Sequence, residues 1–246
     1  IFIGARVEKI NVTNGRVSGV DVHGYDATKV DAVISTVSGM LTCDSLLDAE
    51  NVPEAMKRKA RNAPLSQKAL SIQLGLSNAL DVTSHSISFL PMIEEQYKLF
   101  LPSNGVPEWF TYTVPTITMP ELAPPGGSII EMFSPIDQAW PIDCWNEEAK
   151  AAAAESAITA LSRIHKMDIA VKRILSPKDY RDSMHMFGGA VYGLSPAADP
   201  RAQFPHKTSI GGLFQAGQTT YPGFGVGPAI MSGIFAAEAL MKTVHR

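Results

Sequence analysis

The segment Gly211–Gly233 constrains the fold of this chain more than any other part of its sequence. Leu213 and Phe214 precede a glycine-rich turn that contains Pro222, and the turn opens a long apolar stretch at 226–244. This order predicts a strand, a turn and a helix. Glycines leave the backbone open to a flat ligand, and a helix N-terminus offers unpaired N–H groups and a partial positive charge. The pattern predicts either a ligand site at the start of the helix or a strand-turn-helix unit that only needs tight packing.

The segment resembles the C-terminal flavin-binding motif of the phytoene desaturase family, which also contains carotenoid isomerases. In this motif a Leu-rich strand ends in Ala-Gly, and Pro-Gly-x-Gly precedes a helix of small residues; the matching positions are 213–217 and 222–225. Gly227-Pro228 departs from the family, which more often has proline before glycine at this point. The resemblance implies contacts with FAD from five residues, Gly217 and Gln218 at the ribityl-phosphate and Gly225, Val226 and Gly227 at the pyrimidine edge of the isoalloxazine.

The N-terminal part of the chain resembles the adenine side of the FAD domain in the same family. Valines flank Asn14-Gly15 in the segment 12–22, which is a strong signal for a β-hairpin. The segment 30–36 has the pattern of a short buried strand. The resemblance implies that the backbone of Val7 holds adenine, whereas the residues by themselves also fit an ordinary β-meander.

A third resemblance covers the segment 174–194, which implies a return of the chain beneath the flavin. Gly189 would then let the backbone approach the flavin ring, and Phe187 and Tyr192 would line the substrate cavity. The alternative is a structural turn at the paired glycines, with Tyr192 in the core. His185 is the histidine best placed for a proton role, but a histidine without a visible partner is more often structural, and the catalytic residues are left unassigned.

The organisation follows from these resemblances and from a missing motif. A strand, G-x-G-x-x-G and a helix, with an acidic residue about 20 positions later, would be needed to bind the dinucleotide, and the sequence has no such unit. We therefore expect the C-terminal portion of a two-domain FAD-dependent oxidoreductase, with an α/β Rossmann-like FAD/NAD(P)-binding domain and an α+β substrate domain. The FAD-binding part is expected at 1–45 and 200–246, and the substrate-binding domain with the return segment at 46–199.

Hydrophobic periodicity in the substrate domain predicts helices and an antiparallel sheet. Most of its aromatic residues are expected in the core, and a few could line an apolar cavity. The expected helices are 53–62, 94–100 and 147–166, the last with Asn146 as its N-cap, and the expected strands are 66–76, 86–90, 109–114 and 128–133.

Composition excludes several classes of function. A net charge of −3 argues against a nucleic-acid-binding protein. The basic cluster at 57–61 is expected to be a solvated helix face, with contact to a membrane surface as the lesser possibility. Cys43 and Cys144 have no metal or redox spacing, which makes a reducing compartment the default. No metal is expected, and no apolar run is long enough to span a bilayer.

Three functions are consistent with the sequence. The first is an FAD-dependent oxidoreductase that moves hydride between a hydrophobic, isoprenoid or polyene substrate and flavin N5. The second is a flavin-dependent polyene isomerase without net redox change, and the third is a non-catalytic module that binds an apolar ligand or a partner. The expected partners are a hydrophobic small molecule and an N-terminal nucleotide-binding half, from the same chain or in trans, without which the fragment would be inactive. The expected location is either the cytoplasm or a peripheral site on a membrane.

Overall fold

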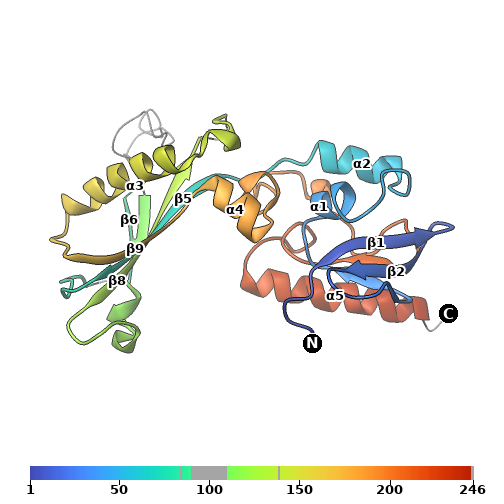
Figure 1. The fold of residues 1–246 in the computed structure, drawn as a ribbon, viewed down its shortest axis with the longest axis horizontal. Helices are drawn as coiled ribbons and strands as arrows, with labels where there is room; N and C mark the ends of the chain where they lie inside the picture. The colour runs from blue at the N-terminus through green and yellow to red at the C-terminus, as the bar shows by residue number, and fades with distance from the viewer. Residues whose placement is uncertain (84, 90–109, 138, 245–246) are drawn as a thin grey trace. The chain divides into compact units, whose positions relative to one another are not determined.

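The computed structural model describes residues 1–83, 85–89, 110–137 and 139–244. The chain divides into two compact units, one made of two separate stretches of the sequence and the other of one continuous stretch. Unit 1 contains residues 1–66 and 192–246, and unit 2 contains residues 67–191 (Figure 1). The predicted helix at 94–100 and Trp109 lie outside the described residues.

Unit 1 begins with a three-stranded antiparallel sheet, in the order β1 (Val7–Thr13), β2 (Arg16–Val22) and β3 (Thr28–Lys29). Asn14 and Gly15 join the first two strands with φ values of 52° and 72°. Two positive φ angles define the turn that matches the twist of a tight hairpin. The hairpin predicted from Asn-Gly is therefore confirmed.

A second, parallel sheet of unit 1 joins two segments that are far apart in the sequence. β4 (Val33–Ser35) pairs with β10 (Leu213–Gln215) along three residues each. All three residues of β10 are buried, and helix α5 (Val226–Val244) packs against this strand. Two further helices, α1 (Gly39–Asp44) and α2 (Glu54–Arg61), follow β4 in the chain. The strand-turn-helix predicted for the C-terminal segment is confirmed.

Unit 2 is a five-stranded antiparallel sheet with the order β6-β7-β8-β5-β9, covered on one face by α3 (Glu147–Ser162) (Figure 1). Burial alternates along β5, and its inward residues pack with alanines of α3 in one core. Full burial of one such leucine stabilises the fold by about 1.5–3 kcal/mol. The strands are β5 (Lys68–Leu76), β6 (Ser86–Phe89), β7 (Phe110–Thr113), β8 (Ser128–Ile136) and β9 (Ile169–Leu175).

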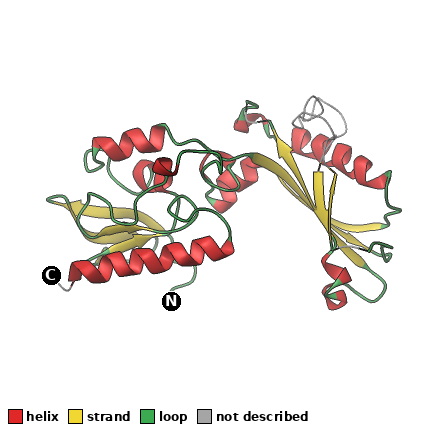
Figure 2. Ribbon diagram, turned by 180° about the vertical axis from the view of Figure 1, so that it is seen from behind, coloured by secondary structure: helices red, strands yellow, loops and turns green. Residues whose placement is uncertain are grey.

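Two single-turn helices, η3 (Pro115–Ile117) and η4 (Pro120–Leu122), connect β7 to β8. The short helices η5 (Ile142–Cys144) and η6 (Phe187–Gly189) also belong to unit 2, and η7 (Pro200–Ala202) belongs to unit 1. Figure 2 shows the helices in red and the strands in yellow in both units. Within the described ranges, no helix combines the length and the apolar character that crossing a membrane requires.

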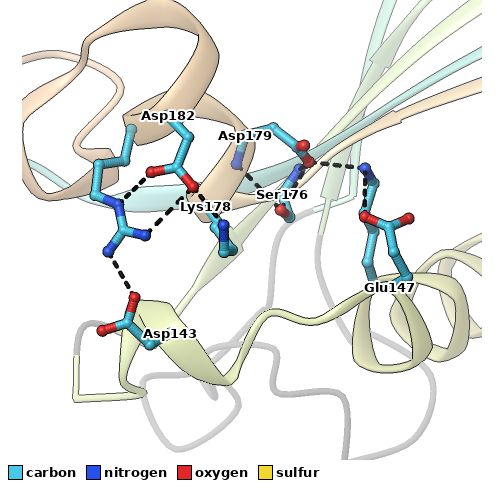
Figure 3. A network of polar contacts seen from close by, with 8 residues as sticks. Asp143, Glu147, Ser176, Lys178, Asp179 and Asp182 are labelled. Atoms are coloured by element: carbon cyan, nitrogen blue, oxygen red, sulfur yellow. Dashed lines mark hydrogen bonds and ion pairs between the residues drawn. The ribbon is translucent and has the colours of Figure 1, made fainter.

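A network of ion pairs joins α3 to α4 (Pro177–Met184) in unit 2 (Figure 3). Ser176 and Asp179 form a capping box at the start of α4, and Nζ of Lys150 lies 2.9 Å from the Asp179 carboxylate. Burial alone would raise the pKa of Asp179, but hydrogen bonds from Ser176 and Lys150 hold that pKa below its ordinary value. Arg181 pairs with Asp143 at the neighbouring turn.

Candidate ligand site at the glycine-rich loop

The carboxyl ends of the parallel strands β4 and β10 meet at Gly217. The N–H of Ala216 donates to the carbonyl of Ser35 (2.9 Å), and the N–H of Gly217 donates to Oγ of Ser232 on α5 (2.7 Å). A Cβ on Gly217 would lie 2.9 Å from the carbonyl oxygen of Thr36, and its φ is +100°. Only glycine fits this crossing of strand and helix. In open α/β sheets, ligands bind beyond the carboxyl ends of the strands, so the loop after Gly217 is the candidate site.

Most polar groups of the loop hold the loop itself in place. The N–H of Gly39 donates to Oγ1 of Thr219 (3.0 Å), and the N–H of Phe204 donates to the carbonyl of Thr219 (2.8 Å). Oγ1 of Thr220 donates to the carbonyl of Gly217 (2.8 Å). Gln218 differs, because it lines a cavity of about 190 Å³. This polar side chain is open to a cavity, and its predicted contact with FAD remains a prediction.

The N-terminus of α5 presents two backbone donors. The N–H of Ala229 donates to the carbonyl of Gly225 (2.9 Å), so Gly225 stands at the start of the helix with φ +101°. Pro228 carries no N–H, which leaves the N–H groups of Val226 and Gly227 in the first turn. The Val226 side chain is 82% exposed, and a Cβ on Gly227 would have no atom within 4 Å. The three positions predicted to face the flavin ring therefore lie at one open helix end.

An aromatic pair borders the same loop. The rings of Tyr192 and Phe224 lie 4.8 Å apart between centroids, and the N–H of Tyr192 donates to Oγ of Ser66 (2.9 Å). At Gly193, whose φ is +69°, a Cβ would lie 3.1 Å from Cγ of Gln218. The predicted cavity residue Tyr192 thus lies at the loop. Phe224 was not singled out from the sequence, because its neighbours Gly223 and Gly225 carried the motif and its ring partner is distant in the chain.

A buried amide at the end of β10 has unmet hydrogen-bonding capacity. Gln215 is 1% exposed, and neither atom of its side-chain amide has a hydrogen-bond partner within the described ranges. Leaving a buried amide unpaired costs about 1–3 kcal/mol. Its backbone carbonyl is bonded to Nδ1 of His206 (3.1 Å). A polar group placed next to the carboxyl end of β10 would satisfy this amide. The sequence pattern could not reveal that the Gln215 side chain is buried without a partner.

Val7 lies at the start of β1, which is an edge strand of its sheet. An edge strand has backbone N–H and C=O groups on its outer side that can bind a further partner. Val7 also lines an apolar cavity of about 380 Å³ within unit 1, together with Phe2, Ala5, Val20, Val22, Tyr25 and Thr28. Its surroundings are suitable for a flat ring, while its predicted contact with adenine remains a prediction.

The remaining predicted site residues belong to unit 2. A Cβ on Gly189 would lie 2.5 Å from the carbonyl oxygen of Pro177, and its φ is +70°, so close packing already requires glycine there. Phe187 is half-buried in η6. His185 is exposed and ends α4 in the left-handed conformation. Their roles toward a flavin or substrate remain predictions.

The described part of the chain has no cluster of metal-ligating side chains, and one of its two thiols is buried. No group of three His, Cys, Asp or Glu side chains there is arranged to hold a metal ion. Burial raises the pKa of Cys43 to about 11, so this thiol stays protonated at neutral pH.

Comparisons with solved structures show which known folds this chain shares. The fold matches an oxidoreductase from Methanosarcina mazei with a TM-score of 0.63 at 16% identity, covering 96% of this chain and 49% of that one. It also matches cyclohexylamine oxidase from Brevibacterium oxydans IH-35A, with a TM-score of 0.58 at 13% identity over 98% and 49% of the two chains. The chain therefore has the fold of about half of each of these two proteins.

Comparison of sequences identifies the relatives of this chain more closely than comparison of folds. No protein family model matches the chain. It is 25% identical to the lycopene-forming phytoene desaturase of Pseudescherichia vulneris over 98% of this chain and 51% of that protein. It is 26% identical to the chloroplastic prolycopene isomerase 2 of an Oncidium hybrid cultivar, over 95% and 41%. The chain is thus a relative of phytoene desaturases and prolycopene isomerases, as its motifs predicted, and it spans about half the length of these curated relatives.

Proposed function

We propose that this chain is the C-terminal portion of an FAD-dependent oxidoreductase that acts on a hydrophobic, isoprenoid or polyene substrate. The relatives named above and the fold support this assignment. The observation that carries it is the open N-terminus of α5, where the backbone of Val226 and Gly227 is exposed at the end of a glycine-rich loop. A flat, polar heterocycle is the kind of ligand that such a helix end can bind through its backbone.

The residues of the loop fit FAD in their chemistry. The chemistry that FAD supplies when bound is the acceptance or return of a hydride at N5. The N–H groups of Val226 and Gly227 would donate to the carbonyl-bearing pyrimidine edge, and the positive end of the α5 dipole would stabilise negative charge there. Gly217 and Gln218 would lie at the ribityl-phosphate. The unpaired amide of Gln215 supports a polar neighbour at this edge of the sheet.

The protein's own contribution to the reaction would be orientation and exclusion of water. Hydride transfer from a C–H bond needs an apolar cavity more than it needs acid or base groups. Tyr192, packed on Phe224 beside the loop, would form part of that wall. Phe187 and Gly189 belong to unit 2, and their predicted roles toward substrate and flavin are part of the same proposal.

An apolar stripe on α5 supports a further part of the proposal. Large apolar side chains are exposed along one side of the helix at Val226, Ile230, Ile234 and Met241. Contiguous exposed apolar residues of this kind mark an interaction surface. We propose that the nucleotide-binding half covers this stripe, whether it belongs to the same chain or is supplied in trans, and that the 246-residue chain alone is inactive.

Similarity to the prolycopene isomerases favours a second candidate, a flavin-dependent isomerisation of a polyene without net redox change. One experiment separates the two. The protein with both halves is mixed anaerobically, in the dark, with phytoene-like and cis-polyene substrates, and flavin absorbance and products are followed. A desaturase loses oxidised-flavin absorbance in proportion to the product formed. An isomerase forms product only with flavin already reduced, and its flavin absorbance stays constant. Absence of both results would contradict the proposed function.

A further inference from the structure

The cavity of about 190 Å³ beside the glycine-rich loop has a second amide in its wall, that of Gln203. Gln203 follows η7 directly, and its Nε2 atom would lie 3.6 Å from a Cβ on Gly223 of the loop. Gln203 and Gln218 are both half-buried, and no hydrogen bond between described residues uses either side-chain amide. Two amides of one cavity wall are therefore available to a ligand.

Lys59 of α2 fixes the backbone that carries Gln203. Its Nζ donates to the carbonyl of Gln203 (2.9 Å) and to the carbonyl of Arg201 (2.5 Å), and it lies 6.0 Å from the centroid of the Phe204 ring. Burial lowers the pKa of Lys59, and no carboxylate of the described residues forms an ion pair with it. The ammonium group of Lys59 thus binds the backbone of this turn rather than a charged partner.

The same turn is bonded to the glycine-rich loop. The N–H of Phe204 donates to the carbonyl of Thr219 (2.8 Å). The ring of Phe204 packs on α1 at Gly39, where a Cβ would lie 2.3 Å from the ring. Because Gln203 precedes Phe204 and Gln218 precedes Thr219, this hydrogen bond fixes the spacing between the two glutamines.

The polar groups of the cavity favour a ligand group that carries hydroxyls. An amide both donates and accepts hydrogen bonds, and a hydroxyl does the same. Ser195 adds a hydroxyl to the wall and Asp199 adds a carboxylate, which pairs with Arg201 at 2.6 Å. No lysine or arginine is among the described residues that line the cavity. A phosphate group accepts hydrogen bonds and is bound best by cations, so it fits this wall less well than a hydroxyl.

We propose that Gln203, together with Gln218, binds a ribityl hydroxyl of the flavin, and that Lys59 is the positioning residue that holds Gln203 at the cavity. The inference rests on the proposed function and adds to the same site a residue from outside the glycine-rich segment. The ribityl chain is the part of a flavin that carries hydroxyl groups. Gln203 would donate to or accept from one of them, while Lys59 acts from behind the turn without touching the ligand.

The test is a fluorescence titration of the apoprotein, with both halves present, with FAD and with deoxy analogues of FAD that each lack one ribityl hydroxyl. We expect Gln203→Leu to raise the Kd for FAD about tenfold, because one hydrogen bond to the ligand is lost. One analogue should bind the wild type about tenfold more weakly than FAD does, and it should bind Gln203→Leu as tightly as the wild type. Its missing hydroxyl would identify the group that the amide contacts.

Variants of Lys59 test the positioning role. Lys59→Met should raise the Kd for FAD and lose the dependence on the same hydroxyl, whereas Lys59→Arg should restore most of the affinity, because a guanidinium also donates to carbonyls. Lys57→Met is the matched control, since Lys57 pairs with Glu54 on the same helix at 4.0 Å. This control should bind FAD like the wild type. Urea unfolding checks that each variant folds.

Several outcomes would overturn the inference. Gln203→Leu could bind FAD as tightly as the wild type, which would exclude a contact. It could also bind FAD and every deoxy analogue more weakly by one common factor, which would assign Gln203 to the fold of the loop. If Lys59→Met keeps the hydroxyl dependence of the wild type, Lys59 does not position Gln203. Failure of the proposed function gives a different result, because the wild type itself would then bind no FAD and both proposals would be wrong.

Discussion

Substitution of Gly227 by alanine separates a binding role from a structural role at the start of α5. A Cβ at this position meets no atom of the protein within 4 Å, and the φ of Gly227 is outside the left-handed region. Alanine is favoured over glycine within helices by about 1 kcal/mol. The structure therefore predicts that Gly227→Ala leaves the free energy of unfolding unchanged or raises it by up to about 1 kcal/mol.

The same methyl group should weaken the binding of FAD. Cα–Cβ bonds in a helix tilt toward its N-terminus, so the added methyl would point toward the place where the flavin edge is proposed to meet the Val226 and Gly227 N–H groups. Loss of one such hydrogen bond costs about 1–3 kcal/mol, which corresponds to about a 10- to 100-fold rise in Kd. The assay is a fluorescence titration of the apoprotein with FAD, using the protein that contains both halves.

Gly233→Ala is the matched control, because Gly233 lies in the same helix and a Cβ there also meets no atom within 4 Å. It should show the same gain in stability and no loss of FAD affinity. If Gly227→Ala binds FAD as tightly as Gly233→Ala, the backbone of this turn does not contact the flavin. If Gly227→Ala unfolds the protein, the geometry described for this turn is wrong.

Three further predictions concern stability and are measured by urea unfolding. Gly217→Ala should destabilise the protein by about 1–3 kcal/mol, because its φ is +100° and its Cβ would meet the Thr36 carbonyl. Leu74→Ala should cost about 2–5 kcal/mol, because Leu74 is fully buried against α3. Asp179→Asn should destabilise unit 2 at neutral pH, because the Asp179 carboxylate has a lowered pKa in the folded state. That difference from the wild type should hold above about pH 5 and shrink as the pH falls through the folded pKa.

Each of these predictions has a result that would contradict it. A Gly217→Ala variant as stable as the wild type would mean that the strand ends do not pack as described. A Leu74→Ala variant as stable as Val171→Ala, which truncates an exposed residue of the same sheet, would place Leu74 outside the core. A stability difference for Asp179→Asn that grows on acidification would mean that the native state binds the proton more tightly than the unfolded state, against the pKa direction described here.

Local sequence signals predicted the elements whose causes are local. Asn14-Gly15 specified the hairpin because both residues accept positive φ. The alternation in β5 specified a strand with one buried face. Helix α4 also had a local signal, the Ser176-Pro-x-Asp179 capping box, but the eight-residue helix was not predicted. Strand β9 was missed because all but its last two residues are exposed, which leaves no clear alternation in the pattern.

The residues of the candidate site also divide into those with a local sequence signal and those without one. Glycines 217 and 225 could be singled out because positive φ and close approach leave a mark on composition. The contact of Phe224 with Tyr192 joins two segments about thirty residues apart, and no local pattern encodes it. The unpaired amide of Gln215 was equally invisible, because the sequence shows a glutamine in a strand but not whether that glutamine finds a partner.

The central claim is that the glycine-rich loop and the N-terminus of α5 hold a flavin when the nucleotide-binding half is present. The most direct measurement is the FAD content of the protein purified with both halves, compared with that of the 246-residue chain alone after incubation with excess FAD. The account predicts FAD in equimolar amount in the first sample and almost none in the second. Absence of FAD from the protein with both halves would contradict it.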